Sequence, residues 1–145
     1  METVKDILKM KGGEIFSVSP ETTVYEALKV MSEKNIGSVL VLNQRKQVSG
    51  IFSERDIVRG MAKKDIDIKT TPVKSLMTKK VLNVGENYTV EECMALMTEK
   101  RIRHLPVVEN GKLSGIISIG DVVKAVIFDQ RFVIDQLERY ISGSM

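Results

Sequence analysis

Apolar and polar residues follow one pattern along the chain, and that pattern occurs twice. Each copy has a short β-prone run, an apolar stripe at helical spacing, two continuous apolar runs joined by a polar turn, and a second helical stripe. This order predicts an α/β fold built from two β-α-β-β-α units, with helices covering one face of each small sheet. The expected short strands are 14–18 and 81–84, and the continuous apolar strands that follow the first helix of each copy are expected at 36–42 and 102–108.

The two copies also share residues at fixed spacing. A shift of 66 positions carries the first half onto the second, and after the hairpin the shift drops to 65 because one loop residue is lost. The lead-in segments 4–8 and 73–77 resemble each other as well. We therefore expect one repeat at 1–65 and another at 66–126, each too small to bury its apolar face alone, followed by a helix and tail at 127–145.

Sequence signals mark where the helices and turns of each copy begin. Thr23-x-x-Glu26 and Thr89-x-x-Glu92 predict capping boxes that open amphipathic helices. Cys93 lies on the apolar stripe of the second of these helices, which indicates packing and not a nucleophile. Asn110-Gly111 predicts a type I′ hairpin, whereas the first copy has a longer polar loop at 43–47.

Three further segments separate or extend the copies. Pro106 removes a backbone donor from its strand, so that strand is expected at an edge or beside something other than a neighbouring strand. Residues 60–71 are charged and rich in hydroxyl groups and predict a linker that carries about one helical turn and stops at Pro72. Residues 125–141 predict a long helix whose apolar stripe folds back onto the repeats or meets a second subunit, and we favour the second subunit. Residues 142–145 are expected to fray.

The stretch around which each copy is organised reads S-G-I-x-S-x-x-D, at 49–56 and at 114–121. A strand ends at Ser53 or Ser118, and Asp56 or Asp121 follows at the start of a helix. The simpler interpretation is a capping box in which Asp takes the place of Glu. The functional interpretation is an anion site at a helix N-terminus, and two copies in matching surroundings favour it.

Composition narrows the possible functions. The 145 residues carry a net charge of +3, with 43% hydrophobic and 28% charged residues, as in a soluble globular protein. The first residues do not form a secretory signal, and no apolar run reaches the ~18–20 residues of a bilayer span, so a cytoplasmic location without a membrane partner is expected. A single Cys and a single His exclude a disulfide within the chain and a Cys- or His-rich metal site. No phosphate-binding loop or nucleophile elbow is present, so no catalytic residue or catalytic cofactor is expected.

Residues 4 to about 126 resemble a tandem pair of cystathionine-β-synthase (CBS) domains, a Bateman module, of the stand-alone bacterial signal-transduction type. The most specific marks are IRHLPVV at 102–108, GIISIGDVV at 115–123 and SERDIVR at 53–59. The resemblance implies a non-catalytic sensor that binds adenine nucleotides between its paired repeats. AMP is the expected ligand, and ATP or NAD(H) are further candidates, as in energy sensing. With no effector domain in this chain, the regulated protein is expected to be separate and met in trans, and a homodimer is expected.

The resemblance also assigns roles to residues. Asp56 and Asp121 would each accept hydrogen bonds from ribose hydroxyls, and Ser53 and Ser118 would contact phosphate. Arg103 and His104 would bind phosphate in the second copy. In the first copy the matching positions are Gly37 and Ser38, neither of which is charged, and this puts phosphate binding in the first copy in doubt. Arg55, at the position equivalent to Gly120, could supply the missing charge. Adenine would lie against two sets of residues, namely Phe16, Ile36, Gly37 and Ser38 for the Asp121 site, and Leu82, Ile102 and Pro106 for the Asp56 site.

Two other functions stay open at this stage. One is a structural interaction module whose ligand sites are vestigial, in which His104 is an ordinary surface histidine. The other is a regulator associated with nucleic acid, which would use the basic residues Lys79, Lys80, Lys100, Arg101 and Arg103. The positive charges are dispersed and aromatic residues are few, so the nucleic-acid hypothesis is the weaker of these two alternatives.

Overall fold

The computed structural model describes residues 2–12, 14–63 and 65–142, so most of the expected tail at 142–145 lies outside the described residues. The chain forms two compact units, each of which is described by itself. The Asp56 unit is Glu14–Leu82, and the Asp121 unit combines Met1–Gly13 with Asn83–Met145. The compact units therefore differ from the order of the sequence repeats, because the N-terminal segment belongs with the second repeat.

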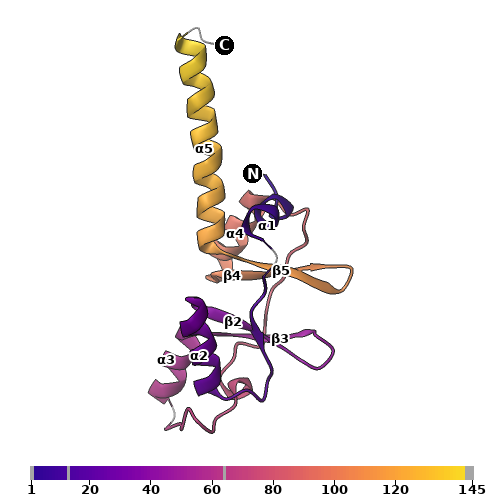
Figure 1. The fold of residues 1–145 in the computed structure, drawn as a ribbon, viewed down its shortest axis with the longest axis vertical. Coiled ribbons are helices and arrows are strands. Elements are labelled where there is room, and N and C mark those ends of the chain that lie inside the picture. Colours follow the sequence, from indigo (N-terminus) through magenta and orange to yellow (C-terminus); the bar gives the residue numbers. More distant parts are fainter. Residues whose placement is uncertain (1, 13, 64, 143–145) are drawn as a thin grey trace. The chain divides into compact units, whose positions relative to one another are not determined.

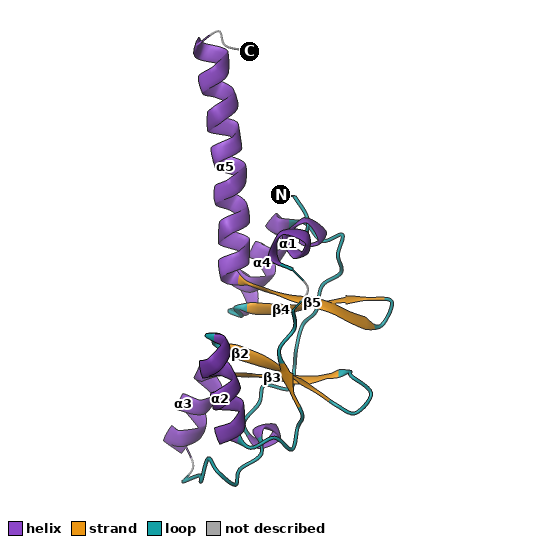
Figure 2. Ribbon diagram, viewed as in Figure 1, coloured by secondary structure: helices purple, strands orange, loops and turns teal. Residues whose placement is uncertain are grey.

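The Asp56 unit is a three-stranded sheet with helices. The strand order is β1-β2-β3, in which β1 runs parallel and β3 antiparallel to β2. The secondary-structure colouring of Figure 2 shows the sheet and the helices of this unit. Its elements are β1 (Ser17–Val18), α2 (Val24–Lys34), β2 (Ser38–Leu42), β3 (Val48–Ser53), α3 (Glu54–Lys63) and the 3₁₀ turn η1 (Val73–Ser75).

The Asp121 unit has a two-stranded antiparallel sheet, β4-β5. Helices α1 and α4 and the first turns of α5 lie on the same side of this hairpin, and the rest of α5 extends away from the unit (Figure 1). Its elements are α1 (Val4–Lys11), α4 (Val90–Lys100), β4 (His104–Glu109), β5 (Lys112–Ser118) and α5 (Ile119–Ser142).

The predicted strand at 81–84 is wrong, since only Val84 makes a β-bridge, in parallel with Val107. The Val84 N–H donates to the Pro106 carbonyl (3.0 Å), and the Val108 N–H donates to the Val84 carbonyl (2.9 Å). The preceding hydrogen bond of this parallel ladder would be donated by the backbone N–H of residue 106, and proline has no N–H. In the Asp56 unit, Leu40 at the same place does donate, to the Phe16 carbonyl (3.4 Å). Pro106 thus shortens the ladder, and its strand is bordered on that side by a single bridge.

The lead-in segments are exchanged between the two sequence repeats. Val4, in the lead-in segment of the first repeat, donates its N–H to the Tyr88 carbonyl of the second (2.9 Å). Val73, in the lead-in segment of the second repeat, donates its N–H to the Thr22 carbonyl of the first (2.8 Å). Positions 22 and 88 are equivalent under the 66-residue shift. Each compact unit is therefore one repeat completed by the lead-in segment of the other.

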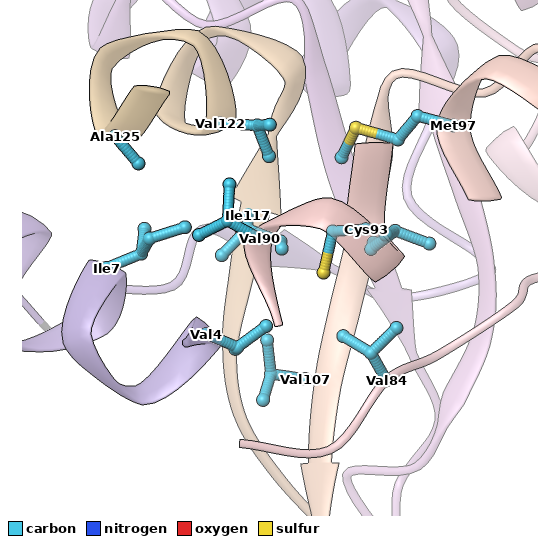
Figure 3. Close-up of a cluster of buried hydrophobic side chains, with 11 residues drawn as sticks. Val4, Ile7, Val84, Val90, Cys93, Met97, Val107, Ile117, Val122 and Ala125 are labelled. Carbon is cyan, nitrogen blue, oxygen red and sulfur yellow. The ribbon is translucent and has the colours of Figure 1, made fainter. Parts of the chain in front are cut away.

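Each unit has its own hydrophobic core. Figure 3 shows how side chains from α1, α4, β5 and α5 point toward one another in the Asp121 unit, with Val4 and Ile7 from the exchanged segment among them. Cys93 is fully buried in this core, as its place on the helix stripe predicts. In the Asp56 unit, Val73 of the exchanged segment packs with Val24, Phe52 and their neighbours.

The helix starts follow the predicted caps with one difference. Thr89 and Glu92 form a complete capping box at α4. At α2, the Thr23 hydroxyl accepts from the Glu26 N–H (3.2 Å), but the Thr23 N–H does not donate to the Glu26 carboxylate. The Thr23 box is therefore only half formed.

The turn is correctly predicted, but two helix boundaries move. Asn110 and Gly111 have φ of 52° and 77°, as a type I′ turn requires. Helix α3 runs to Lys63, so the helical turn expected within the linker at 60–71 lies at its start and continues the preceding helix. Helix α5 begins at Ile119, so the second helix of the repeat and the terminal helix are one continuous element and not two.

Candidate functional site

Each S-x-x-D motif forms a capping box where a strand runs directly into a helix, at the β3–α3 and β5–α5 junctions. The Ser118 N–H donates to Asp121 Oδ2 (2.8 Å), and the Asp121 N–H donates to Ser118 Oγ (3.2 Å). Ser53 and Asp56 make the same pair of bonds, at 2.9 and 3.3 Å. The capping interpretation is therefore confirmed for both copies, and in both it uses the Oδ2 atom of the Asp.

Asp56 is closely held by its surroundings. Its Oδ2 also accepts from the Ser53 hydroxyl (3.1 Å), and its Oδ1 accepts from the Thr78 hydroxyl (2.9 Å). The residue is only 6% exposed. Buried carboxylates need such donors because burial without them is costly.

Asp121 has a cation as its extra partner. Lys11, the last residue of α1, donates from Nζ to Asp121 Oδ2 (2.8 Å) and to the Ile116 carbonyl (2.7 Å). The Lys11 and Asp121 side chains are 32% and 16% exposed. Burial acts to raise the pKa of Asp121, but the bonds from Lys11 and Ser118 outweigh it and lower that pKa below its usual value. Asp121 therefore stays ionised, and its Oδ1 accepts no hydrogen bond from any residue that the structure describes.

His104 and Arg103 lie at the start of β4, next to this junction. His104 is the direct cross-strand partner of Ser118, and the Arg103 carbonyl accepts from the Ile119 N–H (2.8 Å). Burial, with Lys11 and Arg103 adding positive charge, lowers the pKa of His104 despite the opposite effect of Asp121. His104 is thus held neutral at pH 7, while Arg103 is exposed.

The remaining predicted residues are distributed between the two units. In the Asp56 unit, Ser38 is paired with Ser53 across the strands, and Gly37 accepts from the Glu54 N–H (3.1 Å). Lys34 Nζ lies 5.2 Å from the centroid of the Phe16 ring. The others in that unit are Ile36, which is half-buried, and Arg55 and Leu82, which are exposed. In the Asp121 unit, Ile102 is half-buried, Pro106 buried and Gly120 exposed.

Two residues at these junctions, Lys11 and Thr78, were not predicted from the sequence. Lys11 and Thr78 are 67 positions apart, and each follows one of the two lead-in segments. Lys11 binds Asp121 and Thr78 binds Asp56, which in each case is the Asp of the unit that the lead-in segment completes. Lysine and threonine share no side-chain chemistry that a search for internal repeats could detect. Only the exchange of the segments shows that they take the same place.

Other features of the described residues lie elsewhere or are absent. A cavity of about 310 Å³ lies at the end of α3 and is lined by Met61, Ala62, Lys63, Asp65 and Ile66, none of which is a predicted site residue. Within 2–12, 14–63 and 65–142, no cluster of three or more His, Cys, Asp or Glu side chains could hold a metal ion. Over the same ranges, no helix has the length and hydropathy needed to cross a bilayer.

Comparison with known proteins decides the family. Residues 3–63 and 73–127 both match the CBS domain. The chain belongs to the CBS domain family. As a tandem CBS pair it is similar to the mitochondrial CBS domain-containing protein CBSX3 of Arabidopsis thaliana, with 36% identity over 149 aligned positions that cover 97% of this chain and 72% of that protein.

Solved structures of CBS proteins share the fold. A CBS-domain containing protein from Agrobacterium tumefaciens is 43% identical, with a TM-score of 0.82, and the match covers 86% of this chain and 92% of that one. A CBS domain protein from Pyrobaculum aerophilum, solved in complex with AMP, is 24% identical, with a TM-score of 0.72 and coverage of 82% and 88%. The predicted α/β fold of two CBS repeats with a C-terminal helix is confirmed.

Proposed function

We propose that this CBS pair is a non-catalytic regulatory module that binds adenine nucleotides at its two strand-to-helix junctions and acts on a separate protein. AMP is the first candidate, and ATP and NAD(H) are the others. The single observation that carries the proposal is the Asp121 junction, where an ionised carboxylate, with one oxygen that no described residue binds, stands at a helix start beside basic residues. Occupancy would act by favouring one of two conformations that differ in affinity for the nucleotide.

The chemistry of the Asp121 junction suits a ribose 5′-phosphate. A carboxylate has about four acceptor positions, and the Oδ1 atom of Asp121, which accepts no hydrogen bond from the described residues, would accept one from a ribose hydroxyl. Of the first N–H groups of α5, that of Ile119 donates to the Arg103 carbonyl and that of Asp121 to Ser118 Oγ, so the helix dipole and the Gly120 N–H between them would favour an anion. Arg103 and His104 at the start of β4 would add charge-assisted hydrogen bonds to phosphate.

The Asp56 junction repeats the carboxylate and the helix start. Ser53, Arg55 and Asp56 are its candidate ligand residues, and Gly37 and Ser38 offer backbone groups and one hydroxyl. For the base, Phe16 and Ile36 in this unit, and Ile102 and Pro106 in the other, remain the proposed contacts, with Leu82 and Gly120 completing the set. Backbone recognition of adenine would need no particular side chain at these positions.

The test is calorimetric titration of the whole chain with AMP, ATP and NADH, with GMP as the control for the base. The proposal predicts binding of at least one adenine nucleotide and a rise in melting temperature with that ligand, because it binds the folded state. Asp121→Asn keeps a capping oxygen and should lower the affinity by about tenfold, because a neutral acceptor makes a weaker hydrogen bond. Absence of binding by all three would support the structural module instead. Mass spectrometry of small molecules released from the purified protein identifies a co-purified ligand directly.

We further propose that the C-terminal part of α5 joins two copies of the chain. Apolar residues on this part are exposed, and, apart from Ile127, which lies seven positions before Ile134, they recur at spacings of three and four, namely Val133, Ile134, Leu137, Tyr140 and Ile141. A helix that presents such a stripe to solvent needs a covering partner. The stripe fills the a, d and e positions of a heptad, which is the face that a helix presents to other helices in a bundle. A second α5 offers the same face in return.

A further inference from the structure

The two junctions are closed by side chains that take equivalent places but differ in charge. Lys11 binds the Asp121 carboxylate and the Ile116 carbonyl through its ammonium group. Thr78 binds the Asp56 carboxylate through its hydroxyl and exchanges two backbone hydrogen bonds with Ile51 (3.0 and 2.9 Å), the residue equivalent to Ile116. A cation therefore stands at one junction where a neutral hydroxyl stands at the other.

The neighbouring residues increase this difference. The Asp121 unit has Arg103 where the Asp56 unit has Gly37. At the first helical position the Asp56 unit has Glu54, whose carboxylate lies 3.7 Å from the point that a Cβ on Gly37 would occupy, whereas the Asp121 unit has uncharged Ile119. Cations outnumber carboxylates at the Asp121 junction. Within the motif at the Asp56 junction, two carboxylates, Glu54 and Asp56, accompany one cation, Arg55.

We propose that Lys11 makes the Asp121 junction selective for adenine nucleotides with a 5′-phosphate, and that the uncharged Thr78 gives the Asp56 junction no preference for the nucleotide over the nucleoside. This inference rests on the proposed function and adds to it the charge of the ligand that each junction takes. An ammonium group has three N–H donors, and the two bonds of Lys11 leave the third without an acceptor among the described residues. That donor and the positive charge attract phosphate, whereas a phosphate at the Asp56 junction meets two carboxylates.

Nuclear magnetic resonance (NMR) titrations of the ¹⁵N-labelled full chain with AMP and with adenosine test the proposal at each junction separately. The backbone amides of Ser118 and Gly120 report on one junction, and those of Ser53 and Arg55 on the other. The two ligands differ only in the phosphate. We expect AMP to bind at least about tenfold more tightly than adenosine at the Asp121 junction, as a charge-assisted hydrogen bond provides, and about equally at the Asp56 junction.

Exchange of the two side chains is the decisive comparison. Lys11→Thr should clearly lower the ratio of AMP to adenosine affinity at the Asp121 junction, where Arg103 and His104 still favour the phosphate, while Lys11→Arg should keep the ratio at its original value. Thr78→Lys should raise the ratio at the Asp56 junction. Lys9→Thr removes the same charge from an exposed position of α1 and should leave both ratios unchanged.

The possible failures are distinguishable. If neither AMP nor adenosine shifts any of the four amides in the unaltered chain, the proposed function itself fails at these junctions. If both ligands bind but Lys11→Thr leaves their affinity ratio unchanged, the selectivity proposal is overturned and nucleotide binding stands. An equal loss of affinity for both ligands in Lys11→Thr would likewise make Lys11 a structural tie only.

Discussion

Gly50 lies directly beneath the carbonyl group of Thr78, and a Cβ on Gly50 would stand 2.6 Å from that oxygen. The carbonyl is fixed because it accepts a hydrogen bond from the Ile51 N–H (3.0 Å). Gly50→Ala must therefore displace backbone, and we expect it to lower the free energy of unfolding by about 3 kcal/mol. Urea denaturation of the purified variant measures this loss.

Gly115 is the equivalent glycine of the Asp121 unit and provides the matched comparison. A Cβ there would stand 2.6 Å from Leu8 Cδ2, which is the end of a side chain and can rotate away. Gly115→Ala should therefore cost less, about 1 kcal/mol. Equal losses in the two variants would contradict the assignment of the larger effect to the fixed carbonyl.

The ion pair between Lys11 and Asp121 predicts a dependence of stability on pH. Because the pKa of Asp121 is lowered in the folded state, its contribution is present above the unfolded pKa and is lost as the pH falls through the folded pKa. Lys11→Met removes the attraction but not the burial, so the pKa of Asp121 should rise in that variant. The difference in unfolding free energy between the unaltered chain and Lys11→Met should grow from pH 3 to pH 6, to about 1 kcal/mol.

Urea denaturation at several pH values measures this difference. Lys9→Met is the control, since Lys9 is exposed on the same helix, and its difference from the unaltered chain should not vary with pH in this range. A Lys11→Met difference that is equally constant from pH 3 to pH 6 would show that Asp121 does not sense Lys11.

His104 is the single histidine of the chain, so its ring resonances can be followed by NMR without ambiguity. Burial and the charge of Lys11 lower its pKa, and we expect a titration midpoint below 6.5. Lys11→Met should raise the midpoint, because it removes a repelling cation and leaves Asp121 without its partner. An unchanged midpoint in the variant would place the origin of the shift in burial alone.

Cys93 offers a probe of the Asp121 core. Burial, with a smaller effect of the Glu92 charge, raises the pKa of its thiol to about 11, and the side chain is fully buried. A thiol reagent that requires the thiolate should therefore react very slowly at pH 7.5, and the rate should increase with urea as the core opens. Rapid reaction in the absence of urea would contradict the packing role.

Light scattering coupled to size-exclusion chromatography tests the proposed pairing of α5. Leu137→Glu places a charge in the exposed apolar stripe, at a residue that is 55% exposed in the single chain, and should convert a dimer to a monomer. Arg139→Glu lies on roughly the opposite side of the helix, since successive residues are 100° apart, and should leave the dimer intact. Equal effects of the two substitutions would argue against the stripe as the contact.

The sequence predicted features that depend on residues close together in the chain. The Thr89–Glu92 box, the Asn110–Gly111 turn and both S-x-x-D motifs are local hydrogen-bond patterns, and they form as expected. The strand at 81–84 was wrong because its outcome depends on whether residue 106, in another strand, has an N–H to donate. Apolar periodicity cannot show that dependence.

The partners of the two carboxylates were equally inaccessible to sequence reasoning. Lys11 is 110 positions from Asp121, and Thr78 is 22 positions from Asp56. Both contacts exist only because each lead-in segment crosses to the other repeat. The equivalence of Asp56 and Asp121, and the unequal supply of Arg103 and Arg55 beside them, followed from the repeat, but the difference in charge between Lys11 and Thr78 did not.

The crossing of the lead-in segments limits how the chain can be divided. A fragment that ends after the first repeat keeps Val4 and Ile7 but lacks the core in which they are buried, and it also lacks Val73 for its own core. Two copies of such a fragment could satisfy each other by lending their first helices across a twofold axis. Expressed separately the halves should associate, and a gene encoding one repeat alone would produce an intertwined pair.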